Sequence, residues 1–381
     1  MKKNIGILIY SLSGGGAERV VSYLLHYCKI SGVNCTLFLM NNDIRFQLHK
    51  NIRIIYLEKS EANEQGFKKL VKIPYLSFKY YKLLKKYNIE VSISFLTRPN
   101  YINMLSKFFN RKIKVILSER AYPSYEYAGK SMKAKINRFL IKKIYPHSNL
   151  IISNSIGNAN DLINNFDINS SKIKVIHNPV DKFKIDKIKS NSTFFDNNFI
   201  NFITVGRLDD GKNHKFLINA INEMKNSFLR LYIFGEGVNF NKLLNLIKEL
   251  KLENQIFLMG FEANIYEYLK GADCFLFGSR HEGFPNVILE ALACELPVIS
   301  TNCKSGPDEI LLGKVLEIKN IIKTKFGILV PENNLILFVE ALRYFIENRE
   351  DFKLDKKTFL EKLAPYKKEK ILSTYLQCLI D

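Results

Sequence analysis

Two glutamates, Glu282 and Glu290, bracket the start of an expected helix in the segment GSRHEGFPNVILEALACELPVISTN, residues 278–302. Seven residues separate them, a spacing that is common on solvated helices and does not by itself indicate a site. The flanking residues are more informative. CFLFGS is an apolar run typical of a buried strand, and NVILEALAC has the apolar spacing of a helix. We therefore expect Glu282 in a strand-to-helix loop and Glu290 about five residues into the helix.

The loop between these elements has the composition of a ligand-binding turn. Pro285 suits the first helical position, and Gly283 allows the backbone to approach a ligand closely. The apolar run LPVIST then predicts the next parallel strand. Ligands bind beyond the carboxyl ends of such strands, where helix N-termini attract phosphate. Glu290 should lie roughly 7 to 8 Å along the helix, so the two carboxylates could hold different parts of one extended ligand.

Two further loops carry residues suited to a phosphate ligand. SLSGGGAERVV follows the first predicted strand, and its three glycines, including Gly15 and Gly16, let the backbone approach a ligand. This motif is neither a GxGxxG fingerprint nor a P-loop. A tight turn with a purely structural role explains the three glycines equally well. VGRLDDGKNHKFL contains Arg207 and Lys212, a planar fork and a point charge that suit a diphosphate. Taken alone, these two cations are better explained as solvated charges in a polar loop.

The elements that must position these residues form an α/β pattern, because short apolar runs alternate with helical stretches along the whole chain. A polar stretch, KSNSTFFDNN, separates two sets of predicted strands. We therefore expect two domains, residues 1–185 and 186–360, followed by a helical segment, 361–381, that packs back toward the first domain. The first set comprises IGILIYS, NCTLFLM, IRIIYL, VSISFL, KVILSER, NLIISNS and IKVIHNP, and the second comprises INFITVGRL, LRLYIFGEG, QIFLMGF, DCFLFGS, LPVISTN and FGILVP.

Charge is distributed unequally between the two halves. The chain of 381 residues has a formal net charge of +20. Residues 1–180 hold 29 Lys and Arg against 10 Asp and Glu, whereas residues 181–381 hold 28 against 27. This segregation favours an anionic partner for the first half, either a phospholipid surface or nucleic acid. A lysine-rich solvated face without a partner is the alternative.

Taken together, the motifs resemble the GT-B glycosyltransferases, and specifically glycosyltransferase family four, whose members are retaining and depend on nucleotide-sugars. The resemblance covers nearly the whole chain. It rests on the glycine-rich first loop, NPVD, VGRL with the following lysine, GEG, EGFPNVILEALACELPVIS and SGPDEIL. It implies two Rossmann-like doubly wound domains that face a central cleft. It also implies that the first domain binds the acceptor and the second binds the nucleotide-sugar.

The resemblance also implies roles for the residues singled out above. Arg207 and Lys212 would hold the donor diphosphate, and Glu290 would accept hydrogen bonds from the ribose. Glu282 would contact the transferred sugar and stabilise positive charge at its anomeric carbon. The catalytic set is therefore Glu282, Arg207 and Lys212, and the donor-binding set is Gly15, Gly16, Arg207, Lys212, Gly283, Phe284 and Glu290.

One position departs from the family pattern. Many relatives carry a histidine after the fifth strand of the first domain, where this chain has LSERAYPSYE with Glu119 and Arg120. We expect one of these two residues to contact the sugar or the acceptor, or Arg120 to pair with a neighbouring acid.

No metal and no cofactor is expected apart from the nucleotide-sugar donor. The six cysteines show no CxxC pair or zinc spacing and are expected to be reduced thiols. His177, His214 and His281 lie in or beside the motifs without a ligand cluster at metal spacing. The expected activity is retaining transfer of a hexose or N-acetylhexosamine, most simply from a UDP-sugar, to a lipid-linked or glycan acceptor. The pathway would be bacterial surface polysaccharide, lipopolysaccharide or glycoprotein glycan assembly.

Two other functions remain open at this point. A basic nucleic-acid-binding protein would explain the charge, but no known nucleic-acid module is present and such a protein would not need Glu282 or Glu290. We therefore expect no nucleic-acid partner. Another GT-B enzyme, such as a nucleotide-sugar epimerase, would need no acceptor.

Two basic segments of the first half predict contact with a membrane. GFKKLVKIPYLSFKYYKLLKKY, residues 66–87, interleaves lysines with aromatic residues, and Pro74 should divide it into two short helices. The second segment is GKSMKAKINRFLIKK, residues 129–143. No apolar run reaches the length of a membrane span. We expect a cytoplasmic enzyme, peripherally bound to the anionic inner face of the plasma membrane, with an acceptor such as an undecaprenyl-diphosphate-linked glycan. Ordinary packed helices with solvated lysines are the alternative.

Overall fold

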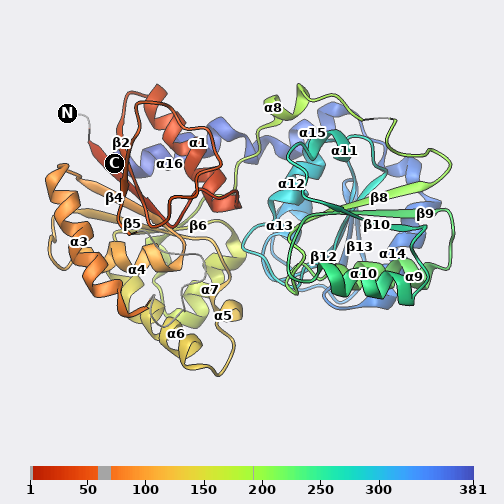
Figure 1. The fold of residues 1–381 in the computed structure, drawn as a ribbon, viewed down its shortest axis with the longest axis horizontal. Coiled ribbons are helices and arrows are strands. Elements are labelled where there is room, and N and C mark those ends of the chain that lie inside the picture. The colour runs from red at the N-terminus through yellow and green to blue at the C-terminus, as the bar shows by residue number, and fades with distance from the viewer. Residues whose placement is uncertain (1–2, 59–69, 192) are drawn as a thin grey trace. The chain divides into compact units, whose positions relative to one another are not determined.

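The computed structural model describes residues 3–58, 70–191 and 193–381, which form two compact units (Figure 1). The first unit comprises Met1–Pro179 and Lys368–Asp381, and the second comprises Val180–Lys367. The chain thus passes into the second unit after Pro179, before the expected boundary at 185, and returns at Lys368, after the expected one at 360. The short helix α8 (Lys182–Asp186) belongs to the second unit.

The first unit is built on a parallel seven-stranded sheet in the order β3-β2-β1-β4-β5-β6-β7. Successive residues of one strand pack on opposite faces, because side chains alternate along an extended chain. Ile7 and Ile9 of β1, for example, join one core cluster and Leu8 joins the other. The strands are β1 (Asn4–Ile9), β2 (Asn34–Leu39), β3 (Arg53–Tyr56), β4 (Val91–Phe95), β5 (Lys114–Glu119), β6 (Leu150–Ser153) and β7 (Ile173–Val175).

Helices cover both faces of this sheet, which is why its strands are apolar throughout. The core cluster on one face includes residues of α3, α4 and α6, and the cluster on the other includes residues of α1 and α16. The helices are α1 (Gly16–Ile30), α3 (Ile73–Lys86), α4 (Thr97–Ser106), α5 (Pro123–Glu126), α6 (Met132–Ile144), α7 (Ile156–Phe166) and α16 (Lys368–Ile380), with short 3₁₀ turns η1 (Tyr145–His147) and η2 (Ser170–Lys172).

The second unit repeats this architecture with the sheet order β10-β9-β8-β11-β12-β14-β13. All neighbouring strands are parallel except β13 and β14, which are antiparallel. The strands are β8 (Ile200–Val205), β9 (Leu229–Phe234), β10 (Ile256–Gly260), β11 (Cys274–Phe277), β12 (Val298–Asn302), β13 (Ile322–Thr324) and β14 (Gly327–Pro331).

The helices of the second unit also divide between the two faces of the sheet (Figure 1). α9, α10 and α14 contribute to one core cluster, whereas α11, α12, α13 and α15 contribute to the other. The helices are α9 (His214–Met224), α10 (Phe240–Glu249), α11 (Tyr266–Leu269), α12 (Asn286–Ala293), α13 (Pro307–Leu312), α14 (Leu335–Glu347) and α15 (Lys356–Leu363), with 3₁₀ turns η3 (Arg349–Phe352) and η4 (Ala364–Tyr366). Both units therefore have the doubly wound α/β fold that the sequence predicted.

The C-terminal helix α16 completes the core of the first unit. It packs against α1 and buries Leu372, Tyr375 and Leu379 in the same apolar cluster. The hydroxyl of Tyr375 also accepts a hydrogen bond of 3.1 Å from Arg120 Nη1, at the carboxyl end of β5. The last helix thus covers part of one face of the sheet, together with α1, and adds a polar contact at the carboxyl end of β5.

We expect Tyr375→Ala to lower the free energy of unfolding of the first unit by roughly 3 to 5 kcal/mol, as for other large buried rings. Tyr375→Phe keeps the ring and loses only the hydroxyl contact with Arg120, so its cost should be about 1 to 3 kcal/mol. Urea denaturation followed by circular dichroism measures both variants. Equal losses in the two variants would contradict a contribution dominated by ring packing.

Candidate functional site

All but one of the predicted donor residues of the second unit lie in loops at the point where its strand order reverses, and Glu290 lies on the helix that follows. β8 and β11 are neighbours in the sheet, and the chain leaves them toward opposite sheet edges. Loop 206–213 follows β8, and loop 278–285 follows β11. Ligands of doubly wound folds bind at such a switch point, outside the carboxyl ends of the strands. Arg207 and Lys212 are in the first loop, and Glu282, Gly283 and Phe284 are in the second.

An ion pair joins these two loops. Lys212 Nζ lies 2.5 Å from Glu282 Oε1, and the exposed fractions of the two side chains are 21% and 14%. A partly buried pair of this kind is screened less by salt than a surface pair. The structure therefore brings together two of the three residues predicted to be catalytic.

Arg207 lies in the same loop but is far more exposed. Its side chain is 82% exposed, and Nη2 lies 3.3 Å from Asp209 Oδ2. Asp209 also accepts a hydrogen bond of 3.0 Å from the backbone N–H of Lys212 through Oδ1. Asp209 therefore orders the loop that carries both cations.

Glu290 lies on α12, where its side chain is 7% exposed. Tyr266, from α11, donates a hydrogen bond of 3.2 Å to Glu290 Oε1. α12 begins at Asn286 and Pro285 is the N-cap, one residue earlier than the expected position of the proline. Pro285 makes no capping side-chain hydrogen bond, and the N-terminus of α12 carries a partial positive charge next to Gly283.

Glycines allow a third loop to pack against the backbone on either side of Arg207. A Cβ on Gly235 would lie 1.9 Å from the carbonyl oxygen of Gly206, and a Cβ on Gly237 would lie 2.5 Å from that of Leu208. The backbone N–H of Leu208 donates to the carbonyl of Glu236 at 2.9 Å. The motif GEG, to which the sequence analysis gave no role, therefore supports the loop of Arg207 and Lys212.

A fourth loop supports the turn around Gly283. Ser305 Oγ donates a hydrogen bond of 2.7 Å to the carbonyl of Gly283. Gly306 has a φ of +110°, and a Cβ there would lie 2.3 Å from Cδ of Pro285. The motif SGPDEIL thus contains a glycine that fits closely against the turn at the start of α12.

Gly15 and Gly16 lie in the first unit, at the carboxyl end of β1. Gly16 begins α1 and Gly15 is its N-cap, with no side chain capping the helix. Gly14, just before them, has a φ of +119°, which favours glycine. This loop also adjoins the strand-order reversal of its own sheet, between β1 and β4.

The structure gives Glu119 and Arg120 partners within the first unit. Glu119 is 1% exposed, and its carboxylate accepts hydrogen bonds from Tyr145 Oη at 2.7 Å and from the backbone N–H of Arg120 at 2.9 Å. The guanidinium of Arg120, at 8% exposure, donates to Tyr375 Oη and Asn178 Oδ1. The expected pairing of Arg120 with an acid is not among these contacts, and the sugar contact stays a prediction.

Burial raises the pKa of Glu119 from 4.5 to about 7, against the opposing effect of the Tyr145 hydrogen bond. Between pH 4.5 and 7 the folded protein therefore binds more protons at this site than the unfolded chain, so wild-type stability falls as pH rises. We expect the free energy of unfolding of Glu119→Gln, relative to wild type, to increase across this window and then level off. Chemical denaturation at several pH values measures this difference, and a difference independent of pH would contradict the expectation.

The metal and membrane findings concern only the described residues. Within residues 3–58, 70–191 and 193–381, no group of three or more His, Cys, Asp or Glu could hold a metal ion. No helix in the same ranges is long and apolar enough to cross a membrane.

Comparison with known proteins identifies the family. Residues 14–182 match the model "Glycosyltransferase Family 4", and residues 185–358 match "Glycosyl transferases group 1". A relative from Campylobacter jejuni subsp. jejuni serotype O:2 is 37% identical over 378 residues, covering 99% of this chain and 100% of its own. Its name is N-acetylgalactosamine-N,N'-diacetylbacillosaminyl-diphospho-undecaprenol 4-alpha-N-acetylgalactosaminyltransferase. The chain belongs to glycosyltransferase family 4.

Further comparisons agree with this assignment and with the GT-B fold. A second enzyme of the same organism, GalNAc-alpha-(1->4)-GalNAc-alpha-(1->3)-diNAcBac-PP-undecaprenol alpha-1,4-N-acetyl-D-galactosaminyltransferase, is 27% identical over 317 residues, with 81% of each chain covered. The crystal structure of Anabaena HepE in complex with UDP superimposes with a TM-score of 0.77 at 18% identity, covering 100% of this chain and 99% of HepE. This glycosyltransferase therefore has the two Rossmann-like domains that the sequence predicted.

Proposed function

We propose that this glycosyltransferase transfers an N-acetylhexosamine from a UDP-sugar to an undecaprenyl-diphosphate-linked glycan with retention of configuration. The observation that carries the proposal is the Lys212–Glu282 ion pair at the switch point, with Glu290 on the helix that follows. The two Campylobacter relatives support the acceptor class, because their names specify undecaprenol-linked diphospho-glycans. Their names also specify α-linked N-acetylgalactosamine, which makes UDP-N-acetylgalactosamine the first donor to test.

The chemistry follows from where charge develops in the reaction. As the bond from the anomeric carbon to the diphosphate breaks, negative charge grows on the leaving diphosphate and positive charge grows on the sugar. Lys212, Arg207 and the N-terminus of α12 stabilise the diphosphate, because cations and helix N-termini attract anions. The Glu282 carboxylate stabilises the sugar, and the proton of the acceptor hydroxyl passes to the leaving diphosphate.

The activity test uses the purified full chain with UDP-linked N-acetylgalactosamine, N-acetylglucosamine, glucose and galactose. Each donor is incubated with and without a synthetic polyprenyl-diphosphate glycan. UDP release and a product extended by one α-linked sugar, seen only with acceptor, support the proposal. Conversion of the donor sugar without acceptor indicates an epimerase instead, and no turnover of any donor rejects the proposed reaction.

Substitution of the two glutamates should affect different properties of the enzyme, UDP binding for Glu290 and turnover for Glu282. We expect Glu290→Gln to weaken UDP binding about tenfold or more, since a hydrogen bond to a charged group contributes about 1.5 to 3 kcal/mol. Glu282→Gln should lower kcat while UDP affinity stays nearly unchanged, because UDP lacks the sugar that Glu282 contacts. Glu317→Gln, an exposed position elsewhere in the second unit, is the matched control. Wild-type UDP binding by Glu290→Gln would remove the ribose assignment.

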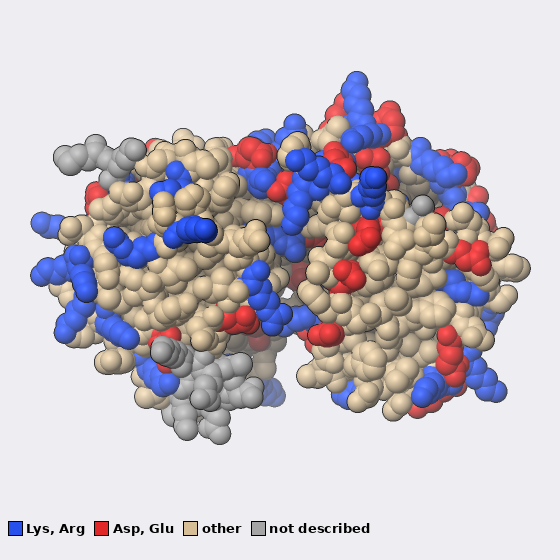
Figure 2. Space-filling model, turned by 45° about the horizontal axis from the view of Figure 1, so that its top comes forward, with Lys and Arg blue, Asp and Glu red and all other residues tan. Residues whose placement is uncertain are grey.

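We also propose that the first unit docks on an anionic membrane. Figure 2 shows Lys and Arg predominating over Asp and Glu on the visible face of this unit, whereas the second unit mixes both signs. Part of the predicted segment, residues 66–69, lies outside the described residues. Most of the rest is helix α3 (Ile73–Lys86), with Pro74 in its first turn and a buried face that includes Leu76, Tyr80 and Leu84.

The exposed side of α3 carries an aromatic cluster next to lysines. Phe78 and Tyr81 pack against Phe109, from the turn after α4, with ring centroids 5.3 and 5.6 Å from that of Phe109. Phe109 remains 50% exposed, and the amine of Lys82 lies 4.6 Å from the Phe78 ring centroid. Exposed aromatic rings beside lysines are typical of surfaces that bind the headgroup region of anionic bilayers. Helix α6, from the second predicted segment, likewise exposes Met132 and Phe139 among basic residues.

Reversing the exposed lysines of α3 should release the protein from vesicles. Each lysine near an anionic surface contributes about 1 kcal/mol, so Lys82→Glu/Lys85→Glu/Lys86→Glu should weaken binding to phosphatidylglycerol vesicles roughly a hundredfold or more. The control reverses three exposed lysines of the second unit, Lys248, Lys314 and Lys357. Co-sedimentation at low salt measures both triple variants. Equal binding by the two, or no binding by wild type, would remove the membrane from the proposal.

A further inference from the structure

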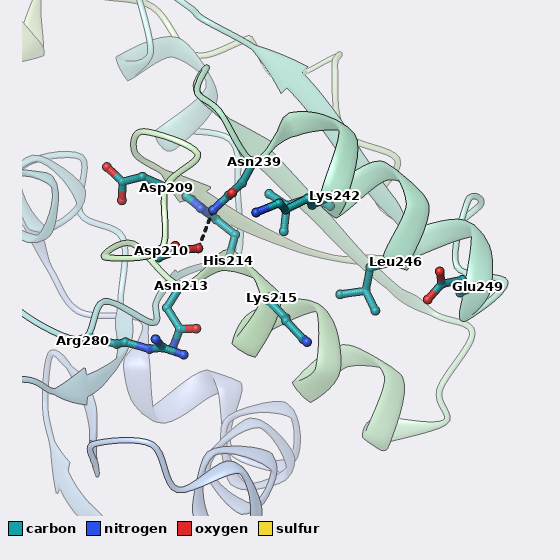
Figure 3. Close-up of a pocket in the computed structure, with 11 residues that line it drawn as sticks. Asp209, Asp210, Asn213, His214, Lys215, Asn239, Lys242, Leu246, Glu249 and Arg280 are labelled. Atoms are coloured by element: carbon teal, nitrogen blue, oxygen red, sulfur yellow. Dashed lines mark hydrogen bonds between the residues drawn. The ribbon is translucent and has the colours of Figure 1, made fainter.

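A cavity of about 260 Å³ lies in the second unit between α9 and α10 (Figure 3). These two helices cover one face of the sheet, whereas α12, which carries Glu290, covers the other. None of the residues Arg207, Lys212, Glu282 and Glu290 lines the cavity. It is therefore separate from the predicted donor site, although the loop after β8 contributes to both.

Three cations from three different elements surround this cavity. Lys215 comes from the first turn of α9, Lys242 from α10 and Arg280 from the loop after β11 (Figure 3). Within the described part of the chain, no hydrogen bond or ion pair engages these three side chains. Three like charges around one small cavity repel one another, so an anion among them would be stabilised.

The acids that line the same cavity are already engaged or lie at its far end. Asp210 Oδ1 accepts a hydrogen bond of 2.8 Å from Asn239 Nδ2. Asp209 is held by the backbone of Lys212 and by Arg207, as described above. Glu249 lies at the other end of α10, beyond Leu246 (Figure 3). Within the described part of the chain, none of these carboxylates forms an ion pair with Lys215, Lys242 or Arg280.

The cavity also adjoins an uncapped helix N-terminus. Asn213 is the N-cap of α9, but its side chain donates to the carbonyl of Gly278 at 3.2 Å and does not cap the helix. The partial positive charge of the first turn of α9 is thus not offset by a capping side chain.

His214 gives a second, independent indication of a ligand. Its side chain lines the cavity, is 3% exposed and has no hydrogen-bond partner for Nδ1 among the described residues. Burial lowers the pKa of His214 to about 4, with Lys212 adding to the effect, so the imidazole is neutral near pH 7. A buried ring nitrogen without a partner is costly, and a ligand group in the cavity would reduce that cost.

We propose that this cavity binds a phosphate-class oxyanion. The three cations, the uncapped N-terminus of α9 and the polar nitrogen of His214 together match the charge and the acceptor oxygens of such a group. Inorganic phosphate and the phosphate of a small metabolite share this chemistry. The site is additional to the proposed donor site, which lies beyond the carboxyl ends of β8 and β11 and includes Glu290 on the other face of the sheet.

The test measures phosphate binding by the full chain, with ionic strength held constant by sodium chloride. Phosphate is also expected to bind the donor residues, so isothermal titration compares Lys215→Ala/Lys242→Ala with Arg207→Ala. Loss of one charge-assisted hydrogen bond corresponds to about tenfold in affinity, so the double variant should bind phosphate roughly a hundredfold more weakly. Lys248→Ala, on the same helix but outside the cavity, is the matched control and should bind like wild type.

The outcomes distinguish phosphate binding in the cavity from phosphate binding at the proposed donor site. Phosphate binding retained in Arg207→Ala and lost in the double lysine variant supports the cavity. The reverse pattern, or no phosphate binding by wild type, overturns it. UDP binding by the double variant should match wild type, so this test does not depend on the fate of the proposed transferase reaction. Glucose 6-phosphate binding more tightly than inorganic phosphate would identify a metabolite as the source, and equal affinities would identify free phosphate.

Discussion

The adjacency of β8 and β11 is the constraint on which the predicted donor site depends. These strands are distant in sequence, yet their hydrogen bonds place the loops of Lys212 and Glu282 side by side at the carboxyl edge of the sheet. A parallel sheet with this order is stable only if helices bury both of its faces, so the apolar layers of α9 and α12 also fix the loops. Gly235 and Gly306 then let two more loops pack on the first pair at distances that no side chain would allow. The chemistry of the site is therefore a consequence of how the two apolar faces are covered.

Much of the fold could be predicted from local sequence, because apolar runs reveal strands that are buried on both faces. Every predicted strand overlaps one in the structure, from IGILIYS at β1 to FGILVP at β14. β13 was missed because it is a short antiparallel edge strand whose central residue, Lys323, interrupts the apolar pattern. For the C-terminal segment, the sequence predicted only that it packs back toward the first domain, and not that Lys368–Asp381 belongs to the core of the first unit. Helical periodicity reveals an apolar face, but it does not reveal which core that face joins.

The contacts of individual site residues were less predictable, because they depend on groups far away in sequence. Arg207 and Lys212 had the same type of charge in one loop, yet the structure pairs Lys212 with Glu282 and leaves Arg207 largely exposed. Glu119, at the end of a predicted strand, was one of two candidates for a contact with the sugar or the acceptor. The structure places its carboxylate against Tyr145 and the backbone inside the first unit, and the contact itself stays a prediction. Tyr266, the partner of Glu290, carried no motif that could have singled it out.

The Lys212–Glu282 pair also bears on the energetics of the proposed reaction. Each charge compensates the other in a partly buried setting, where an unpaired charge would be costly. A donor diphosphate that binds Lys212 competes with Glu282 for the same ammonium group. The net binding energy of the diphosphate is therefore reduced by the cost of weakening the Lys212–Glu282 pair. As charge builds on the leaving diphosphate, Lys212 is drawn more strongly toward it. Under the proposed assignment, Glu282 is then less neutralised at the stage when positive charge develops on the sugar, and both residues would gain interaction energy in the transition state rather than in the ground state.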